Sequence, residues 1–277
     1  MNKSSTKITK RQLESISRQL DDRDNAVLRS LLLARYLTSK QIQRLHFFEI
    51  KNKASGVVIT HRTLIKLKDH GLIEHLERRI GGVRAGSSSF VWVLTDHGYK
   101  LLHPGHKTRK RFYEPSPAFL EHTIATAEAY LQLTEICREN GMELTKIEFE
   151  PKCWRSYSDI HSRNAVLKPD LFAVTATADY EDHYFIEIDL ATEAPTVILD
   201  KCKRYAHYYK GGTEQAKSGV FPFVLWIVPS VSRKESLQRS IASCKSLNPK
   251  SIFTVITPDQ FNILLVHGIE SVSKGVL

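Results

Sequence analysis

Three carboxylates in the second half of the chain have the types and spacing needed for metal chemistry. Asp170 follows Lys168 and Pro169, and Glu187 and Asp189 stand 17 and 19 residues after Asp170. Residues i and i+2 of a strand point to the same face, so Glu187 and Asp189 are expected to share one. Carboxylate oxygens suit Mg²⁺ and Mn²⁺, and such an ion lowers the pKa of a bound water and balances charge on a phosphodiester. We therefore expect a Mg²⁺ or Mn²⁺ site at Asp170 and Glu187, completed by Asp189.

A helix before these strands offers a further ligand. Glu121 and Glu128 are seven residues apart, and therefore on one face, in a helix expected over 118–139. Glu128 is the favoured third metal ligand, although a solvated helix surface explains both side chains equally well. For the strand carboxylates, the plain alternative is the edge of an ordinary α/β sheet. Acidic groups placed among isoleucines are costly without compensation, which favours a site.

The elements around the carboxylates predict an α/β domain with a mixed central sheet over 118–277. Asp170 and Glu187 are expected on neighbouring antiparallel strands, joined by a turn at Asp179–Asp182. A proline-rich linker with a basic cluster is expected over 104–117. From the apolar periodicity, the elements expected are helices over 118–139, 194–210 and 233–246 and strands over 143–153, 165–177, 183–190, 221–228 and 251–256.

The excess positive charge lies in the first part of the chain. The whole chain has 40 Lys and Arg against 30 Asp and Glu, a net charge of +10. Residues 1–116 hold 23 basic and 10 acidic residues, a net +13, and the remainder is near neutral at −3. A basic domain joined to a near-neutral one indicates a nucleic-acid reader linked to a second activity.

The pattern over 23–103 predicts a winged helix-turn-helix. Helices are expected over 23–37 and 55–70, and between them a short helix that follows an N-cap at Thr38–Gln41 and ends near Phe47. Strands are expected over 72–80 and 90–94, with a Gly- and Ser-rich turn at 81–89. In this fold the third helix enters the major groove of double-stranded DNA and the hairpin forms a wing. The expected DNA contacts are His61, Arg62, Lys66, Arg78, Arg79 and Arg84.

Other classes fit the basic half less well. A solvated basic face on a protein-binding module is the plain alternative, but the basic residues cluster on the two elements that would face DNA. An RNA-binding module is disfavoured because this half has no aromatic stacking motif. Residues 1–22 are expected to form a flexible basic arm.

The composition restricts the class of protein further. Hydrophobic residues make up 42% and charged residues 25%, as in ordinary globular proteins. No apolar run approaches the ~20 residues of a membrane span, and the N-terminus does not resemble a signal peptide. The four cysteines lack metal-ligand spacing and are interpreted as reduced thiols, so a cytoplasmic protein is expected. No membrane partner is expected. Trp154 and Trp226 are expected in the core.

The acidic motif resembles that of PD-(D/E)XK nucleases. Asp170 after a proline, then Glu187-Ile188-Asp189 in the next strand, within a helix, three strands, a helix and a strand, carries this resemblance. The nuclease motif ends in lysine, and here Asp189 stands in its place. In some relatives the lysine has moved to the following helix, where Lys201 and Lys203 are available, and Lys168 is adjacent to the motif. Such a lysine would orient the attacking water or stabilise the phosphate.

The chain as a whole resembles the replication-relaxation family of plasmids and integrative elements. The resemblance covers about residues 23–255 and rests on an ordered set of short motifs. These are Arg62-Thr63-Leu64, Gly71-Leu72-Ile73, Gly81-Gly82, Leu94-Thr95 with Gly98, His122, Lys168-Pro169-Asp170, and Glu187–Glu193 followed by Lys201 and Tyr205. The resemblance implies plasmid replication, DNA relaxation and, in nuclease-fold relatives, nicking at an origin of transfer.

Together these patterns predict a relaxase-type, metal-dependent endonuclease of a mobile element, which nicks double-stranded DNA at a plasmid or element origin. The alternative is a non-catalytic replication or transcription regulator with a degenerate nuclease domain used for docking or dimerisation, and a homodimer is left open. Attack by a tyrosine in place of water is also open, with Tyr205, Tyr208 and Tyr209 available.

Overall fold

A computed structural model of the chain describes residues 8–80, 89–106, 114–158 and 163–273. The chain divides into two compact units, Met1–Leu131 and Gln132–Leu277. Among the described residues, no helix is long and apolar enough to cross a membrane. The four cysteines all lie in described segments and are free thiols.

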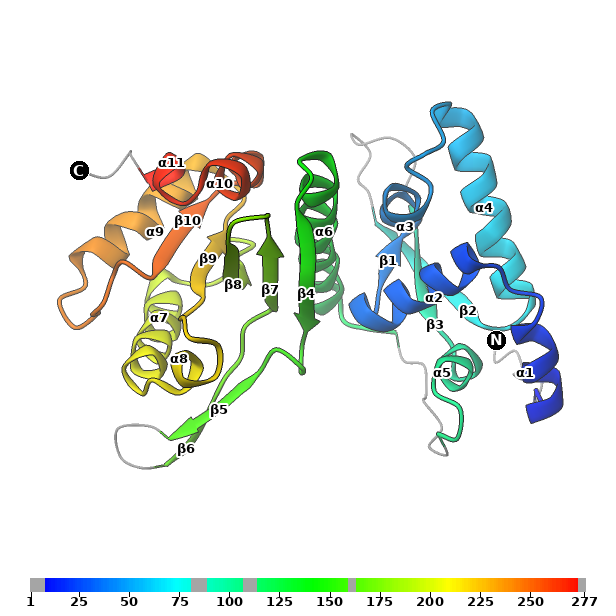
Figure 1. The fold of residues 1–277 in the computed structure, drawn as a ribbon, viewed down its shortest axis with the longest axis horizontal. Helices are drawn as coiled ribbons and strands as arrows, with labels where there is room; N and C mark the ends of the chain where they lie inside the picture. The colour runs from blue at the N-terminus through cyan, green and yellow to red at the C-terminus, as the bar shows by residue number, and fades with distance from the viewer. Residues whose placement is uncertain (1–7, 81–88, 107–113, 159–162, 274–277) are drawn as a thin grey trace. The chain divides into compact units, whose positions relative to one another are not determined.

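The first unit combines helices with a small antiparallel sheet (Figure 1). Its sheet has the order β1-β3-β2, so the hairpin formed by β2 and β3 is extended by the short strand that precedes α3. In chain order, its elements are α1 (Lys10–Ser17), α2 (Asp22–Ala34), β1 (Leu37–Thr38), α3 (Ser39–His46), α4 (Lys53–Asp69), β2 (Ile73–Ile80), β3 (Ser89–Leu94), α5 (Asp96–Leu102) and the first part of α6 (Pro117–Glu139).

Local sequence signals start and end these helices. Thr38 caps α3 by accepting a hydrogen bond from the backbone N–H of Gln41, and the Gln41 side chain bonds back to Thr38, as the predicted N-cap requires. Asp21 and Asp24 form the equivalent box at the start of α2. After α4, Gly71 adopts a φ of +69°, a left-handed conformation that glycine adopts without strain.

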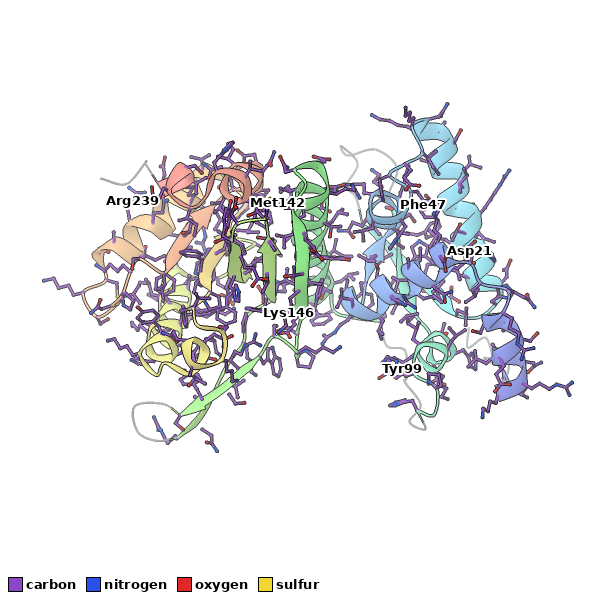
Figure 2. The ribbon with its side chains drawn as sticks, viewed as in Figure 1. Asp21, Phe47, Tyr99, Met142, Lys146 and Arg239 are labelled. Carbon is purple, nitrogen blue, oxygen red and sulfur yellow. The ribbon has the colours of Figure 1, made fainter. Side chains whose placement is uncertain are left out.

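The core of the first unit gathers the apolar faces of α2, α3 and α4 against the hairpin. Leu28, Ile42 and Leu64 are fully buried or nearly so, and Trp92 of β3 donates its indole N–H to Ser39 Oγ at 2.8 Å. Phe47, labelled in Figure 2, is also buried at the end of α3. This packing leaves the opposite face of α4 exposed.

The boundary between the two units falls within α6. Leu120, near the start of this helix, is buried against Leu76 and Val91 of the hairpin, with Ile124 packed beside them. The first half of α6 therefore belongs to the first unit, although the whole helix was expected in the second domain, after a linker at 104–117.

The second unit is built on a five-stranded mixed sheet of order β10-β9-β8-β7-β4 (Figure 1). Strands β4, β7 and β8 are antiparallel neighbours, and β8, β9 and β10 run parallel. Its elements after α6 are β4 (Glu143–Phe149), β5 (Arg155–Ser158), β6 (Asn164–Leu167), β7 (Leu171–Ala176), β8 (Glu181–Ile188), α7 (Pro195–Lys210), α8 (Thr213–Ser218), β9 (Phe223–Ile227), α9 (Val231–Ser243), β10 (Phe253–Ile256), η1 (Pro258–Gln260), α10 (Phe261–His267) and α11 (Glu270–Ser273).

One face of this sheet carries a continuous core with α7 and α9. Phe185 of β8 and Trp226 of β9 are buried with Ile198 and Tyr205 of α7 and Leu237 of α9. Side chains alternate along a strand, so Glu187 shares this face with Phe185. The sheet and α7 thus place an acidic residue inside an apolar layer.

Several elements differ from the sequence expectations. A helix, α1, lies within the predicted arm at 1–22. The strand expected over 165–177 is two strands, β6 and β7, because Lys168-Pro169-Asp170 interrupts it, and β6 pairs with β5 as a separate hairpin. The predicted turn at 81–89 lies outside the described residues except for Ser89.

Candidate functional site

Asp170 and Glu187 are brought together at one end of β7 and β8. Asp170 immediately precedes β7, where its N–H donates to the carbonyl of Ile186 at 3.2 Å. Its Oδ2 accepts the N–H of Ile188 at 2.7 Å, one residue beyond Glu187. The predicted antiparallel placement is therefore observed, and both carboxylates are buried, Asp170 at 6% and Glu187 at 0% exposure.

The Glu187 carboxylate has a partner for each oxygen. Lys201 of α7 forms an ion pair with Oε2, and the Tyr205 hydroxyl donates to Oε1 at 2.5 Å. Lys201 and Tyr205 are four residues apart and so lie on one face of the helix. The Lys201 ammonium also lies 5.7 Å from the centre of the Trp226 ring. Helix α7 thus supplies both contacts to the acidic residue of β8.

Burial and the neighbouring Lys201 charge shift the pKa of Glu187 in opposite directions. Complete burial raises the pKa of Glu187 to about 8, Lys201 lowers it, and the negative charge of Asp170 raises it further. Burial lowers the pKa of Lys201, but the charges of Glu187 and Asp170 outweigh burial and raise it above its usual value. The Lys201 ammonium is thus held against the Glu187 carboxyl group, and the pKa values of both groups lie above their usual values.

The two lysines of α7 that were predicted to replace the motif lysine have different partners in the structure. Lys201 contacts Glu187, whereas Lys203 forms an ion pair at 2.8 Å with exposed Asp200, on the surface of α7. Lys168 lies outside this group as well, with its ammonium 4.5 Å from the centre of the Trp154 ring. Of these three lysines, Lys201 is the one that contacts the acidic pair in the described part of the chain.

Asp189, which stands where the nuclease motif has lysine, faces Arg233 of α9. The guanidinium Nε lies 2.6 Å from Asp189 Oδ2, and one NH₂ group donates to Oδ1 and to the carbonyl of Glu193. The backbone N–H of Ala191 also donates to Oδ1, at 2.8 Å. The Asp189 carboxylate is therefore neutralised and used to hold the loop between β8 and α7.

Glu128, the predicted third metal ligand, contacts residues of α3. Its carboxylate accepts hydrogen bonds from Arg44 at 2.5 Å and from the Gln41 side chain at 3.0 Å, both on α3 of the first unit. The structure does not place it with Asp170 and Glu187. Within the described segments, no three His, Cys, Asp or Glu side chains form a metal-binding group. The acidic site therefore provides a pair of carboxylates.

Two of the three tyrosines considered as nucleophiles are fully buried. Tyr205 is committed to Glu187, and the Tyr208 hydroxyl donates to buried Glu214 at 2.5 Å. Tyr209 is partly buried, with its ring 5.1 Å from that of Phe221. In this structure neither Tyr205 nor Tyr208 presents its hydroxyl to solvent.

The predicted DNA-contacting side chains of α4 fall into two groups. His61 and Arg62 are exposed. Lys66 is instead bound by Asp24, a buried carboxylate of α2, at 2.5 Å. Arg78 and Arg79 lie on β2, but their side chains are outside the described part of the structure, and Arg84 is in the undescribed turn.

The exposed face of α4 also holds apolar residues that the sequence analysis did not single out. Val58 and Ile65 are 46% and 36% exposed, and they lie four residues before and three residues after Arg62. A row at i, i+4 and i+7 forms one face of a helix, opposite buried Thr60 and Leu64. The sequence itself shows this feature, because Val58 and Ile65 lie outside the apolar stripe that the helix buries. Asp69 ends the same exposed face.

Two further residues of the acidic site were missed as partners. Arg233 is 44 residues from Asp189, and no local spacing connects them. Tyr205 was expected as an available nucleophile, and its spacing of four residues from Lys201 is the signal that places both side chains at Glu187. Trp226 is buried as predicted, but Trp154 is 36% exposed, which corrects its assignment to the core.

Comparison with known proteins gives one strong match. The model of the replication-relaxation family matches residues 28–224, well over half of the chain. No curated protein matches the chain. Among solved structures, the restriction endonuclease FokI bound to DNA aligns with 97% of this chain at 15% identity and a TM-score of 0.28, a likeness too weak to define the fold. The chain spans about half the length of that structure, at 51%.

The match covers the hairpin and α4 in the first unit and both carboxylates and Lys201 in the second. The name of the family refers to replication and relaxation. On this match, the chain belongs to the replication-relaxation family.

Proposed function

We propose that this protein is a metal-dependent DNA nickase of a mobile element, in which the first unit binds double-stranded DNA and the second cleaves one strand. The observation that carries the proposal is the group formed by Asp170, Glu187 and Lys201. Two buried carboxylates and a partner lysine whose side chain is 28% exposed are expensive to retain in a fold, since apolar groups of the same shape would cost less. Perturbed, charge-coupled groups of this kind occur preferentially at functional sites.

The topology of the second unit supports a PD-(D/E)XK type of domain. A helix is followed by the antiparallel strands β4, β7 and β8, then by α7 and the parallel strand β9, which is the helix, three strands, helix and strand of that nuclease core. In this proposal Asp170, just before the second strand, and Glu187, in the third, serve as the two motif acids. Lys201 supplies from the following helix the cation that Asp189 does not provide.

The acidic pair fits a divalent cation of the Mg²⁺ or Mn²⁺ class. Mg²⁺ is commonly held by one or two carboxylates together with waters and substrate phosphates, so Asp170 and Glu187 are a sufficient protein contribution. When bound, such an ion supplies charge stabilisation and a more acidic water. Lys201 would add positive charge next to the reacting phosphate, and Tyr205 would hold the orientation of Glu187.

The first unit is proposed to bind DNA as a winged helix, with α4 as the recognition helix. The elements α2, β1, α3, α4, β2 and β3 occur in the order of that fold. The exposed row of α4 combines Arg62 with Val58 and Ile65. Arginine suits guanine edges and phosphates, and apolar side chains suit the methyl group of thymine in the major groove. A homodimer on a two-fold DNA site is compatible with this arrangement.

A non-catalytic regulator is the second candidate, and a specific observation favours it. Asp189 replaces the motif lysine, and its contact with Arg233 fixes it as a structural residue. Glu187 is likewise fully occupied by Lys201 and Tyr205. A chain that had lost cleavage would keep such ion pairs for stability and would use the second unit for docking or dimerisation.

A plasmid-nicking assay separates the two candidates. The full chain is incubated with supercoiled plasmid that carries the DNA flanking its own gene, with Mn²⁺ or Mg²⁺ and with EDTA as a control. Wild type is expected to produce open circles, and Asp170→Asn is not. Asparagine keeps an oxygen that accepts the Ile188 N–H, so the variant removes charge with little disturbance. Asp179→Asn, at an exposed turn of the same unit, is the matched control.

The outcomes discriminate between the candidates. Nicking by wild type and Asp179→Asn, but not by Asp170→Asn, supports the nickase. If no protein nicks and all three shift the plasmid fragment in a gel equally, the regulator is the better account. Measurement of Mn²⁺ binding by calorimetry gives an independent check, because the nickase predicts binding that Asp170→Asn weakens.

A further inference from the structure

Trp154 differs from the other two tryptophans in its exposure. Trp92 and Trp226 are buried, at 1% and 2% exposure, whereas 36% of Trp154 is accessible to solvent. An indole is costly to leave in water, since it buries more apolar area than almost any other side chain. Trp154 follows the short turn after β4 and precedes β5.

A cation and an acid fix the position of this indole. The Lys168 ammonium lies 4.5 Å from the centre of the Trp154 ring, within cation–π range. The indole N–H donates to Glu150 Oε1 at 3.2 Å. Lys168 and Lys152 are themselves exposed. The ring is therefore held in one orientation, with exposed positive charge beside it.

The ring lies beside the segment that carries Asp170. Cys153, the residue before Trp154, donates its thiol to the carbonyl of Pro169 at 3.0 Å. Lys168 is two residues before Asp170 and is the residue that contacts the ring. The contact of the ring with Lys168 and that of the adjacent Cys153 with Pro169 thus place Trp154 beside the residues that lead into Asp170.

We propose that Trp154 and Lys168 form a stacking site for an unpaired nucleobase of single-stranded DNA next to the cleaved phosphate. This inference rests on the proposed function and adds a substrate class to it. An aromatic ring stacks on any base, and a neighbouring lysine neutralises the backbone phosphate. In duplex DNA the faces of each base are covered by its neighbours, so the site selects a strand that has been opened. A nickase that handles a melted origin would need such a contact.

The test measures binding to single-stranded and duplex DNA in EDTA, where no cleavage occurs. A fluorescein-labelled thymidine oligonucleotide of roughly 15 nucleotides and a duplex of the same length are titrated with the full chain by anisotropy. Trp154→Ala is expected to weaken single-strand binding by about tenfold, because stacking of one base contributes on that order. Duplex affinity is expected to stay within about twofold of wild type. Trp154→Phe keeps an aromatic ring and should retain most of the affinity.

Tyr180→Ala is the matched control. Tyr180 is 51% exposed in the turn that joins β7 and β8, at the opposite end of these strands from Asp170. Its removal should leave single-strand affinity unchanged. Intrinsic fluorescence gives a second readout, because thymidine oligonucleotide should quench Trp154 in wild type and leave the buried tryptophans of Trp154→Ala unaffected. Thermal unfolding of each variant checks the fold.

Three results would overturn the stacking site. They are unchanged single-strand affinity in Trp154→Ala, an equal loss for single-stranded and duplex DNA, and no binding of the thymidine oligonucleotide by wild type. The proposed nickase fails separately, if wild-type protein does not nick plasmid in the assay above. A chain that binds single strands through Trp154 without nicking would keep the stacking site and lose the nickase.

Discussion

Arg233 holds Asp189 through two hydrogen bonds, at 2.6 Å from Nε to Oδ2 and at 3.2 Å from NH₂ to Oδ1. This bidentate ion pair connects Asp189, the residue after β8, with α9. Lys201 supplies the positive charge that contacts the acidic pair.

Removal of Arg233 is expected to destabilise the second unit. Arg233→Gln leaves the Asp189 carboxylate buried without a cation, at a cost of about 3 kcal/mol in the free energy of unfolding. Asp189→Asn combined with Arg233→Gln should recover much of that loss, because no uncompensated charge is left. Urea denaturation of wild type, both single variants and the double variant measures the coupling. Strictly additive losses would contradict a direct partnership.

The two lysines of α7 should differ sharply in their effect on cleavage. Lys201→Met is expected to reduce the nicking rate by about 100-fold, since a preorganised charge next to the reacting phosphate contributes on that order. Lys203→Met should stay within about twofold of wild type, because Lys203 pairs with exposed Asp200 and away from the acidic site. Rates are compared under single-turnover conditions, and melting temperatures identify any loss of fold. The reverse ranking of the two variants would reject Lys201 as the replacement for the motif lysine.

Much of the candidate site follows from strand periodicity and order. The expected strands over 165–177 and 183–190 and the helix over 194–210 overlap β7, β8 and α7, the three elements that hold Asp170, Glu187 and Lys201 together. In the helix after β8, position in the sequence left two candidates, Lys201 and Lys203, for the lysine that replaces the motif lysine. Only the packing of α7 on the sheet distinguishes them, because rotation of a helix by two residues turns a side chain by about 200°.

The remaining differences between the expected and the observed contacts concern residues whose partners are distant in sequence. Glu128 has helical spacing from Glu121, but its partners are on α3, 84 and 87 residues away. Lys66 reads as a DNA contact because it is basic and on the third helix, but buried Asp24 satisfies it. Tertiary ion pairs of this kind leave no local pattern. Trp154 was assigned to the core on hydrophobicity alone, which does not distinguish a buried indole from an exposed one.

Arg62 and Lys66 should separate DNA binding from stability. Arg62→Ala is expected to weaken duplex binding by about tenfold and to leave the melting temperature unchanged, because its side chain is exposed. Lys66→Ala leaves buried Asp24 without its cation and should lower the free energy of unfolding by about 1–3 kcal/mol. Anisotropy with duplex DNA at two salt concentrations and thermal unfolding provide the two readouts. Loss of affinity in Lys66→Ala without loss of stability would return Lys66 to the DNA interface.

His46 should make the first unit sensitive to mild acid. Burial lowers the pKa of His46 to about 4, with the charge of Arg23 acting in the same direction, and its Nε2 lies 2.9 Å from Ser30 Oγ. Between pH 6.5 and 4 the unfolded chain binds the proton more readily than the folded chain does. The free energy of unfolding is therefore unaffected by protonation of His46 above about pH 6.5. It falls as the pH drops, by about 2 kcal/mol at pH 5.

The measurement is the free energy of unfolding by urea at pH 7.5 and pH 5, for wild type and His46→Gln. Glutamine keeps a polar group near Ser30 but does not titrate, so the variant should lose less stability than wild type between the two pH values. Glu187 acts with the opposite sign, because its raised pKa makes the folded state bind more protons between its ordinary pKa and about 8. That contribution is common to both proteins and cancels in their difference. Equal slopes against pH for wild type and His46→Gln would show that His46 does not control the acid response.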